Sequence, residues 1–385
     1  MPISARKQAL LLITVLLLAA LAAAAWRYGP RAWQRYYHHG LRLVTVAEGL
    51  DTPWSLAFLP DGRMLVTERP GRMRIVERDG RLGAPLQGLP AVFAQGEGGL
   101  LAVALDPDFA TNRWVYWSYS EPSVTADKGA STAVARARLE GASLVGTQVI
   151  FRQPEKTADT HHFGSRLVFA PDGKLFIGLG DRNRRADAQR LDSAHGKIVR
   201  IAPDGSVPAD NPFVGRPGAL PAIWSLGHRN VQGLALHPRT GELWASEHGP
   251  WGGDEINLIQ RGHNFGWPLV TRGCEYDTCA KIGDAADRPG MDAPVTGWAP
   301  GSAPPTALSF VTSERYPGWR GQLLAGTLLY DRAIMRIELA GHEARHIEPI
   351  YLGRYGRVRD IQQGPDGWLY VVVNLPDGRI VRLER

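Results

Sequence analysis

Residues 167–177 read LVFAPDGKLFI, two short apolar segments joined by the turn Pro171-Asp172-Gly173. Proline presets the backbone angle at one turn position and glycine accepts a positive φ at another, so this stretch predicts a β-hairpin. Similar stretches recur along the chain, and their number decides the fold class.

Four other stretches repeat the order of strand, turn and strand. They read SLAFLPDGRMLVT at 55–67, LAVALDPDF at 101–109 followed by WVYWS at 114–118, LALHP at 234–238 followed by ELWA at 242–245, and IQQGPDGWLYV at 361–371. Between the last two, GQLLAG at 321–326 and AIMRI at 333–337 fill the space of one further unit. Antiparallel units at spacings of roughly 40–50 residues plus loop insertions predict an all-β fold, a six-bladed β-propeller. A β-sandwich is the alternative, disfavoured because its strands would not repeat one turn phrase this often.

The N-terminal 40 residues differ in composition from the rest of the chain. Arg6 and Lys7 precede residues 9–25, an apolar run interrupted only by Thr14, and a small-residue cleavage motif stands before Trp26. This order is typical of an export signal peptide. An uncleaved signal anchor is the other interpretation, because the apolar run lies at the short limit of a membrane span.

We therefore expect two parts: a hydrophobic signal or anchor helix with a short basic and aromatic linker over residues 1–40, and one propeller domain over residues 41–385. Both interpretations of the N-terminus place the propeller outside the cytosol, either soluble in the periplasm or attached to the inner membrane through residues 9–25.

The formal net charge of +6 comes almost entirely from the N-terminus. The chain has 44 Lys and Arg against 38 Asp and Glu, and residues 1–40 hold five of the basic residues and no acidic one. The remaining 39 basic and 38 acidic side chains nearly cancel. A nucleic-acid partner is therefore not indicated.

Cys274 and Cys279 are the two cysteines of the chain, and they lie in a segment typical of a loop. A disulfide between them would close only a short loop and fits an oxidising compartment. Two free thiols are the alternative, whereas a metal site would need more ligands than this pair offers.

Glycine and polar residues are densest between residues 227 and 268, outside the apolar strands. Within this region, residues 249–255 read GPWGGDE, rich in carbonyl and carboxylate oxygens of the kind that Ca²⁺ prefers. The segment lacks the spacing of an EF-hand, so a solvated turn is the alternative.

Three residues elsewhere stand out for their chemistry. His162 comes just before an expected strand, where a neutral imidazole can accept a proton from an alcohol or simply bond to the backbone. Arg357 and Arg359 alternate on an expected strand, so both guanidinium groups would face the carboxylates of a ligand or of nearby acidic residues. Motifs of triad hydrolases, P-loop NTPases and nicotinamide enzymes are absent from the sequence.

These features occur together in five motifs: HFGSRL at 162–167, LGHRN at 226–230, EHGP at 247–250, DEIN at 254–257 and RVRD at 357–360. Over roughly residues 45–383 the chain resembles the soluble PQQ-dependent sugar dehydrogenases, the glucose/sorbosone dehydrogenase family that includes aldose sugar dehydrogenases. The resemblance implies a six-bladed propeller with pyrroloquinoline quinone (PQQ) and Ca²⁺ over the channel mouth. It also implies that an aldose is oxidised at C1 to the lactone and that electrons pass to an external acceptor.

The family likeness also implies roles for single residues. His162 matches the general base that takes the proton of the anomeric hydroxyl as hydride leaves C1 for the quinone. Arg229 and Asn230 match the pair that hydrogen-bonds the quinone oxygens, where charge develops. Arg357 and Arg359 match the clamp on the cofactor carboxylates.

The same likeness implies two calcium ions. The main-chain carbonyls of Gly249 and Pro250 match the ligands of an ion that polarises the quinone. Glu255 and the carbonyl of Phe265 match the ligands of a second, structural ion.

Two positions depart from the family pattern. Tyr330 stands where the family usually has a cofactor-binding lysine, and Glu97 stands where a glutamine commonly precedes Gly-Gly-Leu. Each change would weaken the binding of an anionic cofactor by about 1–3 kcal/mol if the contact is desolvated.

Two other functions fit the scaffold. One is an exported binding module for glycans or proteins that has lost the cofactor, which Glu97 and Tyr330 favour. The other is a calcium-dependent lactonase, which has less use for paired arginines. Trp251, Trp267 and Trp298 could line a sugar site, but tryptophans of a propeller more often pack between sheets, so no role is assigned to them.

Overall fold

The computed structural model contains six four-stranded antiparallel sheets. The residues that it describes are Thr14, residues 40–125, 129–284, 287–298, 301–328 and 333–352, Tyr355, and residues 357–385. Blade 1 consists of β2 (Pro53–Phe58), β3 (Met64–Glu68), β4 (Arg72–Val76) and β5 (Leu82–Pro85). Blade 2 consists of β6 (Leu100–Leu105), β7 (Trp114–Pro122), β8 (Ala130–Glu140) and β9 (Ser143–Arg152). Blade 3 consists of β10 (Gly164–Phe169), β11 (Leu175–Leu179), β12 (Lys197–Ile201) and β13 (Ile223–Leu226).

The second half of the chain continues the same order and closes on the first. Blade 4 consists of β14 (Val231–Leu236), β15 (Leu243–Glu247), β16 (Glu255–Ile259) and β17 (Thr296–Gly297). Blade 5 consists of β18 (Pro305–Phe310), β19 (Leu323–Thr327), β20 (Ala333–Ala340) and β21 (Glu343–Tyr351). Blade 6 combines β22 (Val358–Gln363), β23 (Leu369–Val373) and β24 (Gly378–Glu384) with β1 (Arg42–Leu50) as its outer strand. Short helices lie at Phe109–Asn112 (α2) and Arg185–Gln189 (η2).

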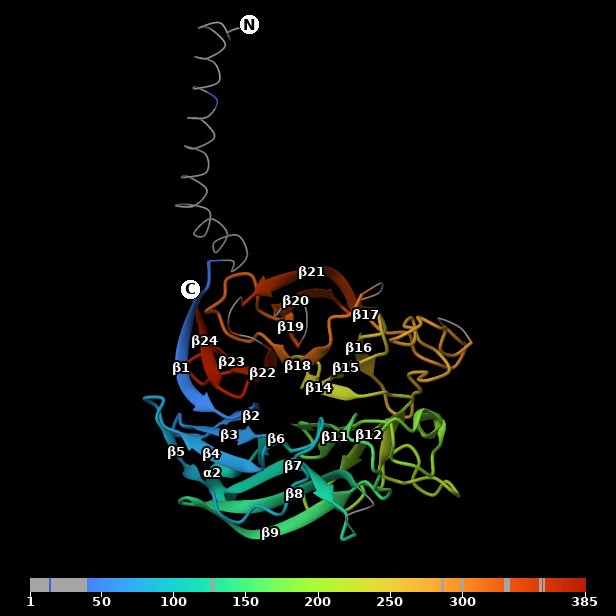
Figure 1. Ribbon diagram of the computed structural model, residues 1–385, viewed down its shortest axis with the longest axis horizontal. Helices are drawn as coiled ribbons and strands as arrows, with labels where there is room; N and C mark the ends of the chain where they lie inside the picture. The colour runs from blue at the N-terminus through green and yellow to red at the C-terminus, as the bar shows by residue number, and fades with distance from the viewer. Residues whose placement is uncertain are drawn as a thin grey trace, which may run out of the picture. The chain divides into compact units, whose positions relative to one another are not determined.

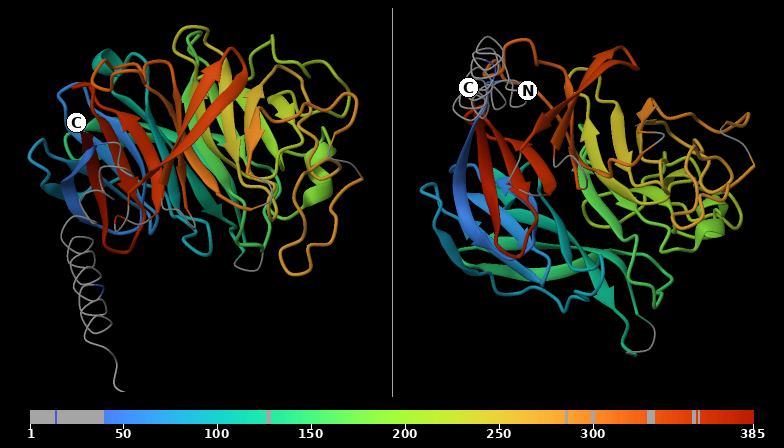
Figure 2. Two further views of the ribbon diagram at one scale, coloured as in Figure 1. Left: turned by 90° about the horizontal axis from the view of Figure 1, so that it is seen from above. Right: turned by 45° about the horizontal axis from the view of Figure 1, so that its top comes forward.

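The first strand of each blade lies toward the middle of the molecule, with the outer strands at its edge (Figure 1). Contacts join these inner strands in a closed ring, from β2 through β6, β10, β14 and β18 to β22 and back to β2. Because β1 pairs beside β24, the two ends of the propeller sequence close one blade together. The predicted six-bladed β-propeller is confirmed, within the single unit Leu43–Glu384 (Figure 2).

Apolar side chains pack between neighbouring blades. Leu65 and Trp117 belong to a cluster between blades 1 and 2, and Val66 and Val372 to a cluster between blades 1 and 6. Each sheet thus has its own hydrophobic interfaces, which allows a chain of this length to fold around a central channel instead of one large core.

The predicted hairpins form where the turn phrases stand. The turn between β10 and β11 has Gly173 at φ 74°, and the turn between β2 and β3 has Gly62 at φ 85°. In blade 5 the predicted unit proved to be the second hairpin, β19–β20, because the first strand at Pro305 leads into a longer loop without the Pro-Asp-Gly turn.

The structure also shows whether the two cysteines are bonded to each other. Cys274 and Cys279 form a disulfide with a Cα–Cα distance of 4.7 Å, so the predicted bond is confirmed. The predicted signal or anchor segment over residues 9–25 lies outside the described residues apart from Thr14. Among the residues described, no helix is long and apolar enough to cross a membrane.

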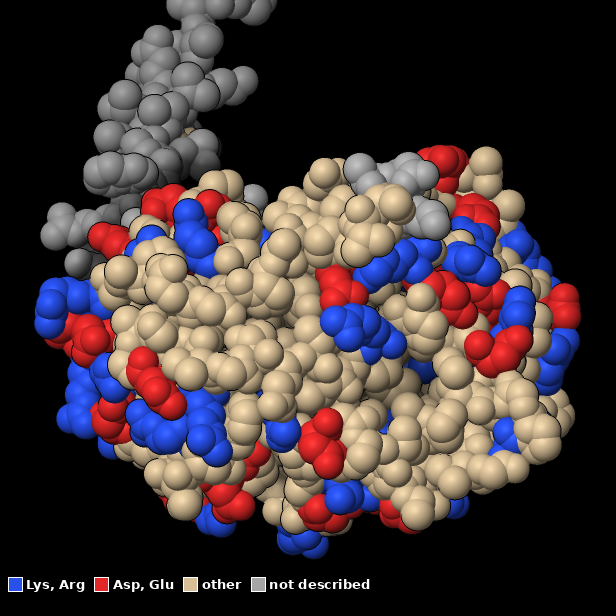
Figure 3. Space-filling view, turned by 90° about the horizontal axis from the view of Figure 1, so that it is seen from below, with Lys and Arg blue, Asp and Glu red and all other residues tan. Residues whose placement is uncertain are grey.

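One face of the propeller shows how charge is distributed on its surface. Basic and acidic side chains are interspersed there, mainly around an uncharged middle, with no patch of one sign across that face (Figure 3). This mixture is consistent with the near-zero balance of residues 41–385 and gives that face no footprint for a nucleic acid.

Candidate active site

A cavity of about 450 Å³ opens among loops and inner strands contributed by all six blades. Its lining combines four arginines with three histidines, two carboxylates and several aromatic rings: Trp54, Arg69, Gly96, Glu97, Leu101, His161, His162, Phe163, Gly164, Arg229, Gln232, His248, Asp254, Tyr276, Pro304, Leu328, Arg357 and Arg359. The volume is that of a site for a small ligand or cofactor.

Irregularities in strand pairing help to direct side chains into this cavity. The inner strand of every blade shifts register against its neighbour near its first residues. Trp54, Leu101, Gln232 and Arg359 each lie within such a shift and line the cavity. A bulge leaves a residue out of the ladder and re-aims its side chain, which explains how unpaired positions converge here.

His162 is held by a carboxylate that the sequence did not single out. Its Nδ1 lies 2.7 Å from Asp181 Oδ1, and Asp181 Oδ2 accepts a hydrogen bond of 2.7 Å from Trp267 Nε1. Burial alone would raise the pKa of Asp181, but the hydrogen bond and charge of His162 hold that pKa below its usual value. An ionised carboxylate only accepts, so Nδ1 donates to it and Nε2 is the atom able to take a proton.

Glu97 compensates charge in the cavity. Its Oε2 accepts a hydrogen bond of 2.7 Å from the backbone N–H of His162, which has a positive φ of 54°. The Glu97 charge also acts favourably on Arg69, Arg357 and Arg359. The glutamate that departs from the family pattern is therefore paired, and it holds the loop that carries His162.

Four arginines give the cavity an excess of positive charge. Burial lowers the pKa of Arg69, Arg357 and Arg359. For Arg359 the pKa falls to about 9, because the charges of Arg357 and Arg69 add to the effect of burial. Burial, followed by the charges of Arg359 and Arg229, also lowers the pKa of His248 well below its usual value, so that imidazole is neutral.

Several nitrogens of this cluster lack acceptors. Within the described part of the chain, the buried Nε atoms of Arg229, Arg357 and Arg359 have no hydrogen-bond partner. Buried donors are normally satisfied, so their convergence in one cavity indicates an anionic ligand.

Arg229 reaches the cavity from the loop between β13 and β14. Its Nη1 donates to the carbonyls of His248 at 3.1 Å and Gly249 at 2.7 Å, and its backbone N–H donates to Glu247 Oε2 at 2.7 Å. Asn230, predicted beside it, lies behind the lining residues, where its Oδ1 accepts from the Gly164 N–H at 3.0 Å and its Nδ2 has no partner among the described residues.

A buried ion pair joins blades 3 and 6. Arg166 Nη1 donates to Asp360 Oδ1 at 3.0 Å, and the two side chains are 5% and 0% exposed. Asp360 Oδ2 accepts from Ser55 Oγ at 3.0 Å, and Arg166 Nε donates to the Gln232 carbonyl at 3.0 Å. The pair thereby ties together four blades at the centre of the ring.

The predicted calcium ligands Gly249 and Pro250 differ from Glu255 in their surroundings. The Gly249 carbonyl already accepts from Arg229 and, at 3.1 Å, from the Tyr276 hydroxyl, while the Pro250 carbonyl accepts from Gly253 N–H at 2.9 Å. The Arg229 guanidinium would have to move away before the Gly249 carbonyl could bind Ca²⁺, because the two cations repel each other.

The surroundings of Glu255 suit a cation better. It pairs across the sheet with Glu247, and Asn257 Nδ2 donates to both carboxylates, at 3.3 and 2.9 Å. Burial and then the Glu247 charge raise the pKa of Glu255, and the charge of Arg272 opposes them only in part. A cavity of about 10 Å³ lies beside Glu255, lined also by Asp254 and Arg272, with room for one small particle.

Phe265 is buried beside this pair, its ring stacked at 4.8 Å on His228, whose Nδ1 lies 3.0 Å from Glu247 Oε1. Among the described residues, no group of three or more His, Cys, Asp or Glu side chains is arranged to hold a metal ion. Backbone carbonyls would therefore have to complete any calcium site.

The structure brings five predicted residues into one cavity: Glu97, His162, Arg229, Arg357 and Arg359. Tyr330 lies outside the described residues. Sequence reasoning missed Asp181, Arg69, His248 and Tyr276. Asp181, Arg69 and Tyr276 come from separate loops without a shared spacing, so no local pattern could have grouped them, whereas His248 lies within the EHGP motif without a role being predicted for it.

The chain is similar to known sugar dehydrogenases over nearly the whole propeller. A sequence model of the family described as glucose / sorbosone dehydrogenase matches residues 50–382. The aldose sugar dehydrogenase YliI of Escherichia coli is 43% identical over 349 residues, covering 89% of this chain and 93% of its own length. A crystal structure of glucose dehydrogenase is 43% identical, with a TM-score of 0.85, over 89% of this chain and 99% of that one. The PQQ-bound form of an aldose sugar dehydrogenase from Streptomyces coelicolor is 32% identical, with a TM-score of 0.74, over 89% of this chain and 98% of that one.

Proposed function

Because the chain belongs to the glucose/sorbosone dehydrogenase family, we propose that it oxidises the C1 hydroxyl of an aldose to the lactone, with PQQ as bound oxidant. The electrons then leave to an external acceptor. The observation that carries the proposal is the cluster of Arg229, Arg357 and Arg359, whose buried Nε atoms have no partner among the described residues.

PQQ fits the chemistry of this cavity because it is a small, flat molecule with several carboxylates. Arg69, Arg357 and Arg359 would hold those carboxylates, and the ring of Trp54, 5.6 Å from the Arg359 guanidinium, supplies an apolar wall. When bound, PQQ supplies an ortho-quinone that accepts two electrons and the hydrogen of C1.

The chain's own residues supply proton transfer and charge stabilisation. His162 Nε2 takes the proton of the C1 hydroxyl, and Asp181 fixes the tautomer and stabilises the imidazolium that forms. The guanidinium of Arg229 lies where it can donate to an oxygen on which negative charge grows. Loss of one proton and one hydride equivalent from C1–OH balances the conversion of the aldose to its lactone.

Absorbance spectroscopy tests the proposal directly. Purified protein supplied with PQQ, Ca²⁺ and an aldose should reduce the bound quinone, and failure over a broad panel of aldoses would refute the enzymatic role. The glycan- or protein-binding alternative fails if PQQ saturates the protein at micromolar concentration in a calorimetric titration. Its support from Glu97 is weakened, because that carboxylate is compensated.

Replacing Arg359 with methionine is expected to weaken PQQ binding by roughly 10–100-fold, the worth of a hydrogen bond to a charged group. The cofactor-free protein should not lose stability, because burial and the neighbouring arginines oppose the Arg359 charge. Calorimetry and thermal unfolding measure the two effects. Arg81→Met, in which a side chain 78% exposed is changed, is the matched control. Equal loss of affinity in both variants would contradict the role of Arg359.

We also propose that Glu255 holds a structural calcium ion together with backbone carbonyls. At a free Ca²⁺ concentration 100 times the dissociation constant, an ion that binds only the folded state stabilises it by about 2.7 kcal/mol. The thermal midpoint should therefore rise by a few degrees with CaCl₂ and fall with a chelator, and Glu255→Gln should abolish this response. Glu140→Gln, at the exposed end of β8, should keep it. A calcium effect that survives in Glu255→Gln would place the ion elsewhere.

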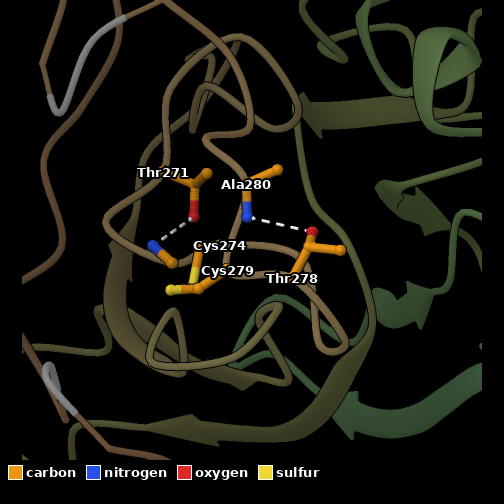
Figure 4. Close-up of a disulfide and its surroundings, with 6 residues drawn as sticks. Thr271, Cys274, Thr278, Cys279 and Ala280 are labelled. Carbon is orange, nitrogen blue, oxygen red and sulfur yellow. Dashed lines mark hydrogen bonds between the residues drawn. A yellow bond between two sulfur atoms is a disulfide. The ribbon is translucent and has the colours of Figure 1, made fainter.

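The calcium ion predicted on the Gly249 and Pro250 carbonyls stays a prediction, and no step of the proposed reaction depends on it. Export is likewise a proposal. Its support is the apolar run over residues 9–25 behind Arg6 and Lys7, together with a disulfide that suits an oxidising compartment (Figure 4). N-terminal sequencing of the mature protein from cell fractions distinguishes cleavage from anchoring.

A further inference from the structure

Two consecutive histidines line the cavity, and each is paired with its own aspartate. In the inner pair His162 Nδ1 lies 2.7 Å from Asp181 Oδ1, and the two side chains are 9% and 0% exposed. In the outer pair His161 Nδ1 lies 3.0 Å from Asp159 Oδ1, and the two side chains are 55% and 34% exposed. One pair is therefore buried and the other is open to solvent, and the proposed reaction uses only the buried one.

Asn183 connects the inner and the outer pair. Its Nδ2 donates to Asp159 Oδ2 at 2.8 Å, and its backbone N–H donates to Asp181 Oδ1 at 2.9 Å. Asn183 has a positive φ of 58° and Arg182 before it one of 52°, so a left-handed turn follows β11 and presents Asn183 to both carboxylates. One residue thus holds the two aspartates at a fixed separation.

Hydrogen bonds also fix the segment that carries the outer pair. The guanidinium of Arg182 donates to the carbonyls of Asp159 and His161, and the His161 backbone N–H donates to Asp159 Oδ1 at 2.8 Å. Burial alone would raise the pKa of Asp159, but hydrogen bonds from Asn183 and His161 hold that pKa below its usual value. The carboxylate is therefore ionised, so His161 Nδ1 donates to it and Nε2 is the atom able to carry a proton.

The balance of the proposed reaction requires protons to leave this cavity. An aldose that becomes a lactone gives up two electrons and two protons. An external acceptor that takes only electrons leaves both protons in a cavity where four arginines already hold positive charge. Because the His162 imidazole takes up one proton at a time, each turnover needs a route by which this imidazole returns protons to solvent.

We propose that His161 relays protons between the His162 imidazole and solvent, with Asp159 as its counter-charge. This inference rests on the proposed function, which generates the protons. The two rings meet edge to face with their centres 6.3 Å apart, within reach of proton transfer through one water molecule. His162 Nε2 gives up the proton and His161 Nε2 accepts it and then releases it to the buffer, so no electrons move in the relay.

His342 offers a matched control for His161. Its Nε2 lies 2.8 Å from Glu242 Oε1, and the two side chains are 57% and 35% exposed, close to the values of the outer pair. His342 is outside the described lining of the cavity. The two histidines therefore match in exposure and in having a carboxylate partner, and they differ in their place relative to His162.

Nuclear magnetic resonance of the cofactor-free protein provides the first test. With ¹⁵N-labelled histidine in a weak buffer, relaxation dispersion measures how fast the His162 imidazole gains and loses its proton. His161→Gln keeps a donor for Asp159 but cannot carry a proton, and it should slow this exchange by about tenfold, with recovery on addition of free imidazole. His342→Gln should keep the parent rate. Equal exchange in the parent and His161→Gln overturns the relay.

Turnover of the PQQ-loaded enzyme provides the second test. With glucose and ferricyanide, which takes one electron per ion and no proton, His161→Gln should lower kcat by about tenfold in weak buffer. Imidazole should restore kcat, and reduction of the bound cofactor by glucose in a single turnover should keep its parent rate. A loss of kcat that imidazole does not repair, or an equal slowing of the single turnover, would show that His161 acts on the sugar or on the fold and would refute the relay.

The two tests separate this inference from the proposed function. A protein that never reduces PQQ, but in which proton exchange at His162 depends on His161, would keep the relay and refute the dehydrogenase. An active enzyme whose kcat in weak buffer is untouched by His161→Gln would keep the dehydrogenase and refute the relay.

Discussion

Turnover of an aldose by the PQQ-loaded enzyme is expected to fall by about 10²–10⁴-fold when His162 is replaced with alanine, the usual contribution of a general base. PQQ binding should persist, because the arginines that face the carboxylates are unchanged. The measurement combines steady-state kcat with calorimetric titration of PQQ. Loss of turnover with retained cofactor supports the base, whereas turnover close to the parent value removes that role from His162.

Asp181→Asn is the companion variant that tests the orientation of the imidazole. An amide can donate to Nδ1, and this favours the tautomer with the proton on Nε2, where it blocks proton transfer from the sugar. Turnover should therefore fall although His162 itself is intact. The control Asp192→Asn changes an exposed carboxylate that pairs with Arg190 on the surface, and it should leave turnover unaltered.

The second large effect concerns stability. Asp360→Asn is expected to destabilise the propeller by about 3–5 kcal/mol, because it leaves the buried Arg166 guanidinium without its counter-charge. Burial lowers the pKa of Arg166, and the Asp360 charge is what opposes that effect. Thermal unfolding of the cofactor-free protein should show a midpoint lower by roughly 5–10 °C.

A double variant makes this prediction specific to the ion pair. Asp360→Asn combined with Arg166→Met removes both charges and should recover part of the lost stability, since an apolar replacement of a buried pair is often neutral. Asp79→Asn, in the exposed pair with Arg81, should leave the midpoint unchanged. Purely additive losses in the double variant would show that Arg166 and Asp360 do not act as a pair.

Most of the fold could be predicted because propeller blades are local structures. The first two strands of each blade lie within about twenty residues of sequence, so a turn motif such as Pro171-Asp172-Gly173 between them predicts their hairpin. Blade 5 was the exception, where a loop from Val311 to Gln322 replaces the tight turn and only the second hairpin carried a signal. The closing of blade 6 by β1 could not be read from a pattern, since its partners lie more than 300 residues away.

The site was predictable only where motifs mark it. His162, Arg229, Arg357 and Arg359 stand in recognisable motifs, and the cavity unites them. Asp181 stands 19 residues beyond His162 and reaches it only because β10 and β11 form a hairpin that brings their ends together. The hydrogen bond that Glu97 accepts from the His162 backbone N–H spans 65 residues, so the sequence alone could not show that this carboxylate has a partner in the fold.

The shifted registers of the inner strands suggest how this scaffold can be re-engineered. Trp54, Gln232 and Arg359 lie at positions that the ladder pairing skips, so the bonds that build the sheets depend little on which side chain stands there. A combinatorial library confined to Gln232 and Arg359 would alter what the propeller accepts while leaving its architecture intact, whereas Trp54 belongs to a buried hydrophobic cluster and would be kept. Natural divergence of substrate range could follow the same route.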